Sequence, residues 1–136
     1  MNHSDYKLSL DLRIDWSDLD MYEHVNNLTF MRFLQSGRVN FWEATGIHEY
    51  FKNSRKGTML VSSHCDFKNS LYYPGTATVK TKLAETGNSS FALKHIILND
   101  KEEICAEGKD VVVCYDFENK TTFRIPDWLR ETISKY

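Results

Sequence analysis

The 136-residue sequence has no long apolar run and no excess of either charge. A membrane-spanning helix needs about 20 apolar residues, and no such stretch occurs, so we predict no membrane span. The first ten residues, MNHSDYKLSL, contain an acid and no apolar segment, which argues against a signal peptide. With 17 basic and 19 acidic residues, the formal charge is -2, so the chain lacks the basic field that binds nucleic acid. We therefore expect a cytoplasmic protein with no nucleic-acid partner.

Cysteine is scarce, with only Cys65, Cys105 and Cys114. An odd number at wide spacing, with no CxxC pair, argues against a disulfide framework and against a zinc-ligand pattern. We expect reduced, buried thiols and no metal site. The sequence also lacks a serine nucleophile elbow and a glycine-rich phosphate loop, which removes two common kinds of catalytic centre.

The residues that are present suit one globular domain over residues 1–136, with 41% hydrophobic and 13% aromatic residues. Residues 7–16 alternate apolar and polar side chains, which predicts a strand with an apolar face. Its members are Leu8, Leu10, Leu12, Ile14 and Trp16. Residues 28–44 then follow a helical period that closes at Gly46, and their apolar positions cover most of the circumference, which predicts an enclosed helix. Gly37 in its middle predicts the close approach of another backbone.

Four further strands are predicted over residues 59–67, 76–85, 89–98 and 104–117, with short turns between them and a bulge near Gly108. Pro126 begins a short C-terminal helix. Connections this short favour an antiparallel sheet, so the expected class is α+β, with one long helix and five strands. A curled sheet leaves an exposed edge, which favours at least a dimer.

Residues 17–27, SDLDMYEHVNN, combine carboxylates, a histidine and two asparagines just before the long helix. One interpretation is a helix cap, in which these oxygens accept hydrogen bonds from free backbone N–H groups. The other is a hydrolytic site, in which a carboxylate works beside those N–H groups. By itself the segment leaves both open. His24 can cap, orient the site or act as a base, whereas we expect structural or solvated roles for the others, His3, His48, His64 and His95.

The string W-S-D-L-D-x-x-x-H-V-N-N, followed by F-M-R-F-L-Q-S-G-R, resembles the 4-hydroxybenzoyl-CoA thioesterase-like family. The resemblance continues through GNSSFALKH at 87–95, AEGKDVVVCYD at 106–116 and IPDWLRE. It implies a hotdog fold, a homodimer or dimer of dimers with active sites between subunits, and an acyl-CoA thioesterase. It implies no cofactor, because coenzyme A is part of the substrate.

The resemblance also assigns residues. It implies that Asp20 is the essential carboxylate and that the backbone N–H near Asn27 polarises the thioester carbonyl. We add His24 to the predicted catalytic set. We further predict that the substrate contacts Val25, Asn26, Phe30, Thr58, Ser89 and Ser90.

Three departures from the family pattern matter. Glu23 stands where glycine is usual. Gln35 stands where a glutamate is frequent and cannot act as a base, which leaves Asp20 as the expected catalytic carboxylate. The TGNSSF turn lacks the basic residues that some relatives use for CoA phosphates. The remaining candidates are Lys56, Lys80, Lys82 and Lys94, and an acyl carrier protein is an alternative carrier. A non-catalytic hotdog module and a hotdog dehydratase are competing interpretations.

Overall fold

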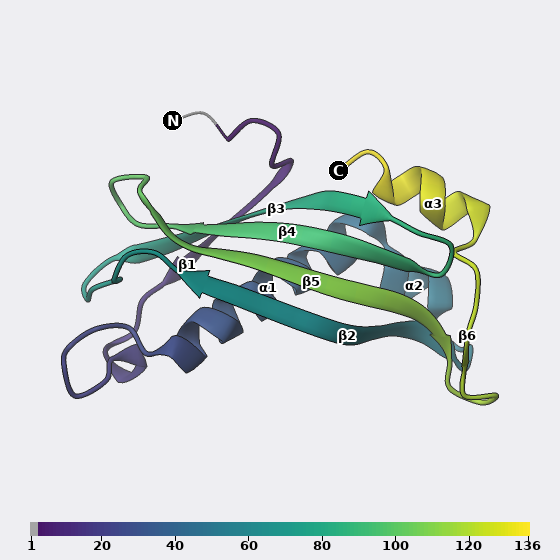
Figure 1. Ribbon diagram of the computed structural model, residues 1–136, viewed down its shortest axis with the longest axis horizontal. Coiled ribbons are helices and arrows are strands. Elements are labelled where there is room, and N and C mark those ends of the chain that lie inside the picture. The colour runs from purple at the N-terminus through teal and green to yellow at the C-terminus, as the bar shows by residue number, and fades with distance from the viewer. Residues whose placement is uncertain (1–2) are drawn as a thin grey trace.

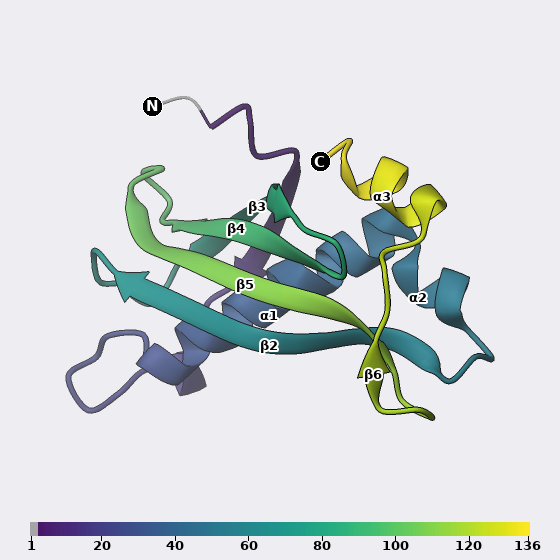
Figure 2. The ribbon, with the colours of Figure 1, turned by 45° about the vertical axis from the view of Figure 1, so that its right-hand side comes forward.

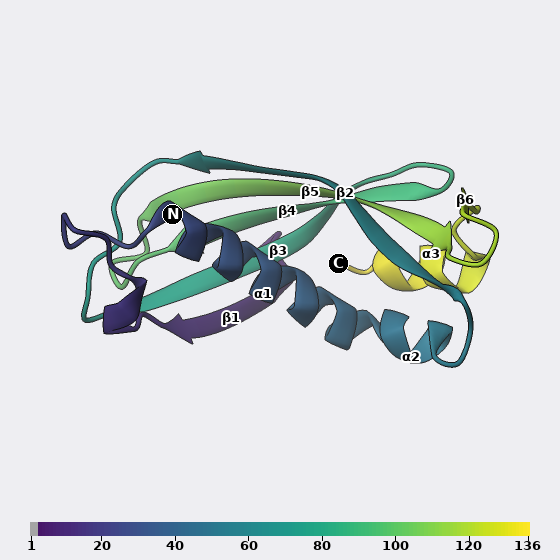
Figure 3. The same cartoon turned by 90° about the horizontal axis from the view of Figure 1, so that it is seen from below.

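The computed structural model describes residues 3–136 and shows a long helix lying across the concave face of a curved sheet (Figures 1 and 3). The helices are α1 (Asn27–Thr45), α2 (Ile47–Phe51) and α3 (Asp127–Ile133), with a 3-10 turn, η1, at Trp16–Asp18. The strands are β1 (Leu8–Arg13), β2 (Lys56–Phe67), β3 (Thr76–Thr86), β4 (Ser90–Leu98), β5 (Ile104–Asp116) and β6 (Thr121–Thr122). The predicted α+β class and hotdog arrangement are confirmed.

The sheet has the order β1-β3-β4-β5-β2, and every neighbouring pair is antiparallel. The two-residue β6, which pairs with β5, was not predicted, nor was α2. Strand β2 begins at Lys56, three residues before the predicted start at residue 59. Because β2 pairs only with β5 in the described chain, its other side is an open edge 12 residues long.

The first strand ends earlier than its alternation predicts. Ile14 is buried, but Trp16 is 73% exposed instead of continuing the apolar face. The cause is local, because the Asp15 side chain accepts a hydrogen bond from the Ser17 backbone N–H and caps η1. A side-chain cap competes with continued extended structure, and here the cap prevails.

Helix α1 begins after Asn26, whose side chain caps it, and ends at Gly46, where φ is 72°. Its inner face carries Phe30, Phe33, Leu34 and Phe41, all buried. The prediction of an enclosed helix is wrong for a single chain. Leu28 is 71% exposed and Val39 is 41% exposed, since the sheet covers only one side of the helix.

Gly37 sits close to the sheet, but side chains of the sheet approach it rather than another backbone. A Cβ atom there would lie 2.7 Å from Val79 Cγ1 and 3.1 Å from both Thr81 Oγ1 and His95 Nδ1. Contacts below 3.0 Å require something to shift. The missing side chain therefore makes room for a polar cluster beneath the helix.

That cluster, the Asp110 network, joins four strands and the helix. His95 is fully buried, with Nδ1 2.8 Å from Thr81 Oγ1 and Nε2 2.8 Å from Asp110 Oδ2. Arg38 Nη1 donates to the same Asp110 oxygen at 2.9 Å, and Ser63 Oγ donates to the other at 2.8 Å. Burial opposes ionisation of Asp110, but these partners outweigh it and hold the pKa of that carboxyl below its ordinary value.

The predicted bulge at Gly108 is wrong. Residues 106–114 of β5 keep a regular alternation of burial, and a Cβ atom on Gly108 would lie 2.8 Å from the Leu34 side chain of α1. The irregularity in β5 comes earlier, because Ile97 pairs with Ala106 and Leu98 pairs with Ile104. Glycine at this position therefore serves close packing against the helix, not a break in the ladder.

Two apolar clusters fill the space between helix and sheet. One surrounds Phe33 and Leu34, in the first half of α1. The other surrounds Phe41 and Trp42 and includes residues of α2 and α3. These two short helices lie near the C-terminal end of α1 (Figure 2). No helix within residues 3–136 is long and apolar enough to cross a membrane. The first cluster supports the loops that form the candidate site.

Candidate active site

The segment from Leu19 to Val25 is a small hairpin closed by one antiparallel β-bridge. Asp20 N donates to His24 O at 2.8 Å, and Glu23 N donates to Asp20 O at 3.0 Å. Glu23 has φ of 63°, in the left-handed region. A three-residue hairpin loop places its last residue in that region, which explains a usual glycine at this position. The chain keeps the turn with glutamate in place of glycine.

The Asp20 carboxylate is held by this hairpin. Its Oδ1 accepts from the backbone N–H groups of Tyr22 at 2.8 Å and His24 at 3.2 Å. Within residues 3–136, Oδ2 has no hydrogen-bond partner. One oxygen therefore fixes the orientation of the group, and the other remains available to a substrate or a water molecule.

The start of α1 presents one free donor. Leu28 N–H is taken by the Asn26 side chain at 2.9 Å, and the N–H groups of Thr29 and Phe30 reach Asn26 O. Asn27 N–H has no acceptor among residues 3–136. Helix capping and an available donor thus coexist in one segment, because the cap satisfies some N–H groups and leaves another.

An ion pair and two backbone hydrogen bonds fix this segment against the core. Arg32 Nη2 lies 2.8 Å from Asp18 Oδ1, and Asp18 O accepts from Asn26 N at 2.8 Å. Val25 N donates to Leu71 O at 3.0 Å, which ties the hairpin to the loop after β2. Of the three aspartates near the helix, Asp18 is thus a structural anchor, and Asp15 caps η1, where bonds from Ser17 lower its pKa.

The first of two pockets beside Asp20, which we call the helix-end pocket, has a volume of about 600 Å³. It brings together five of the predicted site residues, Asp20, His24, Val25, Asn27 and Phe30. The rest of its wall comes from residues 67–70, which include the basic residue Lys68, and from Tyr72. Asp20, the helix-start residue Asn27 and the basic residue Lys68 therefore line one cavity.

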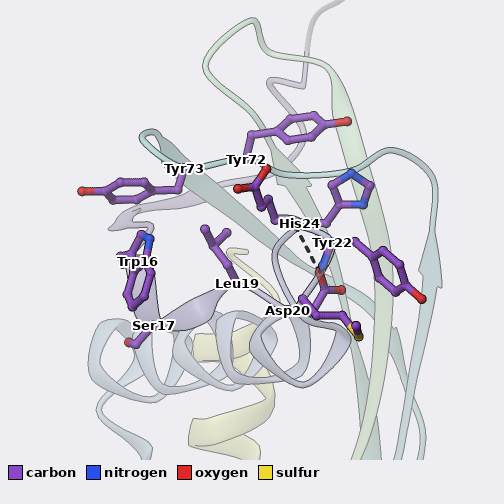
Figure 4. Close-up of a pocket in the computed structure, with 10 residues that line it drawn as sticks. Trp16, Ser17, Leu19, Asp20, Tyr22, His24, Tyr72 and Tyr73 are labelled. Carbon is purple, nitrogen blue, oxygen red and sulfur yellow. Dashed lines mark hydrogen bonds between the residues drawn. The ribbon is translucent and has the colours of Figure 1, made fainter.

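The second, which we call the aromatic pocket, has a volume of about 730 Å³. Asp20, His24 and Tyr72 line both pockets and so form the wall between them. The rings of Trp16 and Tyr73 lie together on the far side of the aromatic pocket (Figure 4). The His24 ring packs edge-on against Tyr72, with centroids 5.2 Å apart.

Other predicted substrate contacts lie at the opposite end of the sheet. Thr58 is near the start of β2 and pairs with Cys114, while Ser90 begins β4 opposite Val113. Ser89 O accepts from Cys114 N at 2.9 Å. Asp20, by contrast, is next to the end of β2, at Phe67. Within one chain, neither of the two pockets beside Asp20 is lined by Thr58, Ser89 or Ser90.

Several residues of the pocket walls were not predicted from the sequence. The alternation of the first strand predicts a buried face for Trp16, and Tyr72 and Tyr73 stand only within a predicted turn. Among the lysines proposed for phosphates, Lys82 pairs with Asp5, whereas Lys68, which was not proposed, lines the helix-end pocket. The available signal for the tyrosines was their place beside proline and glycine in LYYPG.

Neither the thiols nor a metal cluster offers a competing centre. Burial raises the pKa of all three cysteine thiols, that of Cys114 to about 11, which disfavours a thiolate nucleophile. Within residues 3–136, no three His, Cys, Asp or Glu side chains are grouped so that they could hold a metal ion.

Comparison with known proteins gives a consistent result. A family model described as the thioesterase-like superfamily matches residues 14–133. The Escherichia coli protein named long-chain acyl-CoA thioesterase FadM is 19% identical over 129 residues, which cover 94% of this chain and 98% of FadM.

Solved structures agree on the fold. A predicted thioesterase from Bacillus stearothermophilus is 25% identical, with a TM-score of 0.83 and 93% of each chain covered. A DHNA-CoA thioesterase from Staphylococcus aureus is 19% identical, with a TM-score of 0.81, and the alignment covers 93% of this chain and 88% of that one.

Proposed function

Because the chain belongs to the thioesterase-like superfamily, we propose that it is a thioester hydrolase that cleaves an acyl-CoA to a free acid and CoA. The observation that carries this proposal is the shared cavity of Asp20 and the free Asn27 N–H. A thioester carbon needs a nucleophile on one side and a donor for the oxygen that becomes negative. The helix-end pocket supplies one of each.

In the proposed reaction, the carbonyl oxygen accepts from Asn27 N–H while the free oxygen of Asp20 attacks the carbon or removes a proton from water. If Asp20 attacks, the thioester C–S bond breaks, CoA leaves, and water then hydrolyses the resulting anhydride. If Asp20 acts as a general base, the water that it deprotonates adds to the carbonyl carbon, and the C–S bond breaks in the same way. Both routes release the CoA thiol. A thioester is already activated, so no serine triad is needed. The backbone of His24 orients Asp20, since its N–H and C=O both bond to Asp20.

We propose free CoA as the carrier in preference to an acyl carrier protein. Lys68 supports this, because it is 48% exposed in the wall of the helix-end pocket and 4.0 Å from its carboxylate partner, Glu107. A partly solvated cation at the mouth of a site suits the phosphates of CoA. The activity named for FadM also supports an acyl-CoA substrate.

Asp20→Asn tests the mechanism. The asparagine Oδ1 still accepts from Tyr22 and His24, so the hairpin should persist while the negative charge is lost. We expect thiol release from a panel of acyl-CoAs to fall by about 10²- to 10⁴-fold.

Asp11→Asn is the matched control, because Asp11 is exposed on β1, lines neither pocket and keeps its Oδ1 bond from Thr78 as asparagine, so turnover should be unchanged. Wild-type turnover in Asp20→Asn would refute the role of this carboxylate. Binding of acyl-CoAs by the unmodified protein without any turnover would instead support a non-catalytic module.

We further propose a homodimer formed by pairing of two β2 edges. The open edge carries exposed Leu60, Val61 and Phe67, at 41%, 53% and 53%. Antiparallel pairing would bring the start of one β2, with Thr58, beside the end of the other, at Phe67 and the helix-end pocket. This would reunite the substrate contacts that a single chain keeps apart.

Val61→Lys tests this pairing. Val61 lies at the middle of β2, so a two-fold axis through the paired edges would bring the two lysines close together. Like charges on facing strands destabilise the pair, and lysine on an edge strand opposes pairing in natural proteins. We expect the variant to sediment as a monomer and to lose thioesterase activity. Val61→Thr, which keeps the shape without a charge, should remain dimeric, and a fully active Val61→Lys monomer would contradict the proposal.

A further inference from the structure

The aromatic pocket combines ring faces with negative charge. Its exposed rings belong to Trp16, Tyr22, Tyr72 and Tyr73, which are 73%, 72%, 57% and 41% exposed (Figure 4). Its carboxylates belong to Asp20 and Glu23, and none of the residues from 3–136 that line it is Lys or Arg. The pocket is therefore unsuited to an acyl group that ends in a second carboxylate.

Glu23 is held there at a conformational disadvantage. Its φ of 63° suits glycine, and a residue with a Cβ atom is strained in this region. Its carboxylate has no hydrogen-bond or ion-pair partner among residues 3–136. The charge thus forms no contact that stabilises the fold, and it lines the aromatic pocket.

Ring faces and carboxylates both attract cations. The π-face of Trp or Tyr carries negative electrostatic potential, and quaternary ammonium groups bind where several such faces meet. A nearby carboxylate adds a Coulombic attraction that a neutral acyl chain does not gain. The helix-end pocket, on the other side of Asp20, is lined by one basic residue, Lys68. The two pockets therefore complement the two ends of a cationic acyl-CoA, whose acyl head is positive and whose phosphates are negative.

We propose that the aromatic pocket receives the acyl group and selects acyl groups that carry a cationic head, such as a trimethylammonium group. Glu23 is the specificity-determining residue, with Trp16, Tyr72 and Tyr73 as the ring surfaces. This inference rests on the proposed thioesterase function, and the hydrolysis itself is unchanged. The CoA arm then lies on the Lys68 side of Asp20.

A set of three acyl-CoAs of similar length tests the proposal. One ends in trimethylammonium, one in the neutral isostere tert-butyl, and one in a carboxylate. We expect kcat/KM for the cationic substrate to exceed that for the neutral isostere by about tenfold or more, with the carboxylate poorest. Glu23→Gln and Trp16→Leu should each reduce the cationic-to-neutral ratio by about threefold or more. Glu131→Gln, on the exposed face of α3, is the charge control and should keep the ratio.

Direct binding of the free trimethylammonium acid, measured by calorimetry, provides a readout without turnover. Binding that weakens in Glu23→Gln and Trp16→Leu supports the proposal even if no thioester is cleaved. A lack of cleavage would overturn only the proposed hydrolase function. Hydrolysis of all three substrates with a cationic-to-neutral ratio near one overturns the selectivity and leaves the thioesterase standing. If the free trimethylammonium acid does not bind to the protein at all, the proposed selectivity is also overturned.

Discussion

Asp110→Asn probes the most deeply buried charge in the described chain. The side chain of Asp110 is fully buried, and it accepts from Arg38, Ser63 and His95 at 2.8 to 2.9 Å. Asparagine has nearly the same shape but no charge, so it leaves the Arg38 guanidinium, 14% exposed, without its counterion. Loss of one partner from a buried ion pair costs about 3–5 kcal/mol.

The small exposure of Arg38 lets water compensate part of its lost pairing, so we expect the lower end, about 3 kcal/mol. That change should lower the melting temperature by roughly 10 °C. Urea titration followed by circular dichroism measures the free energy of unfolding, with both proteins at equal concentration because any self-association adds to stability.

The double variant Arg38→Met/Asp110→Asn separates the pair from simple loss of packing. Methionine removes the cation that Asp110→Asn leaves unpaired, so the two changes together should destabilise by less than the sum of the single changes, by about 1 kcal/mol or more. Additive effects, or a loss below about 1 kcal/mol in Asp110→Asn, would refute the view that this ion pair is important for stability.

Two further predictions concern the same region. Gly37→Ala should destabilise by about 1–2 kcal/mol in thermal unfolding, although alanine favours a helix, because the new Cβ lies 2.7 Å from Val79 Cγ1; a stabilised variant would contradict this. The pKa of Asp110 is lower in the folded protein than its ordinary value of 3.8, so ionised Asp110 contributes to stability above pH 3.8. This contribution is lost as the pH falls through the lower pKa of the folded state. The urea midpoint should therefore fall less steeply between about pH 5 and about pH 3 in Asp110→Asn than in the wild type.

Much of the fold followed from local pattern. The period of residues 28–44 predicted α1 to within one residue at either end, and Gly46 marked its end. The alternating runs predicted β2 to β5, and their short turns predicted antiparallel pairing. These features are determined locally, because side-chain periodicity and turn chemistry act over a few residues.

The errors arose where a contact distant in sequence, or a side-chain cap, decided the outcome. Trp16 left the strand because Asp15 caps η1, and Gly108 suggested a bulge because its packing partner, Leu34, lies in a different element. His95 looked like an ordinary strand histidine, and only the assembled sheet places it between Thr81 and Asp110.

For the site, the sequence by itself determined that a carboxylate segment precedes a capped helix, and a family resemblance singled out Asp20. Only the tertiary structure decided that Asn26 uses up the neighbouring N–H groups while Asn27 N–H stays free, and that Asp20 stands between two pockets. It also brought Tyr72 and Lys68 to those pockets from the loop after β2. Pocket walls depend on residues distant in sequence, and no local pattern encodes which of them will meet.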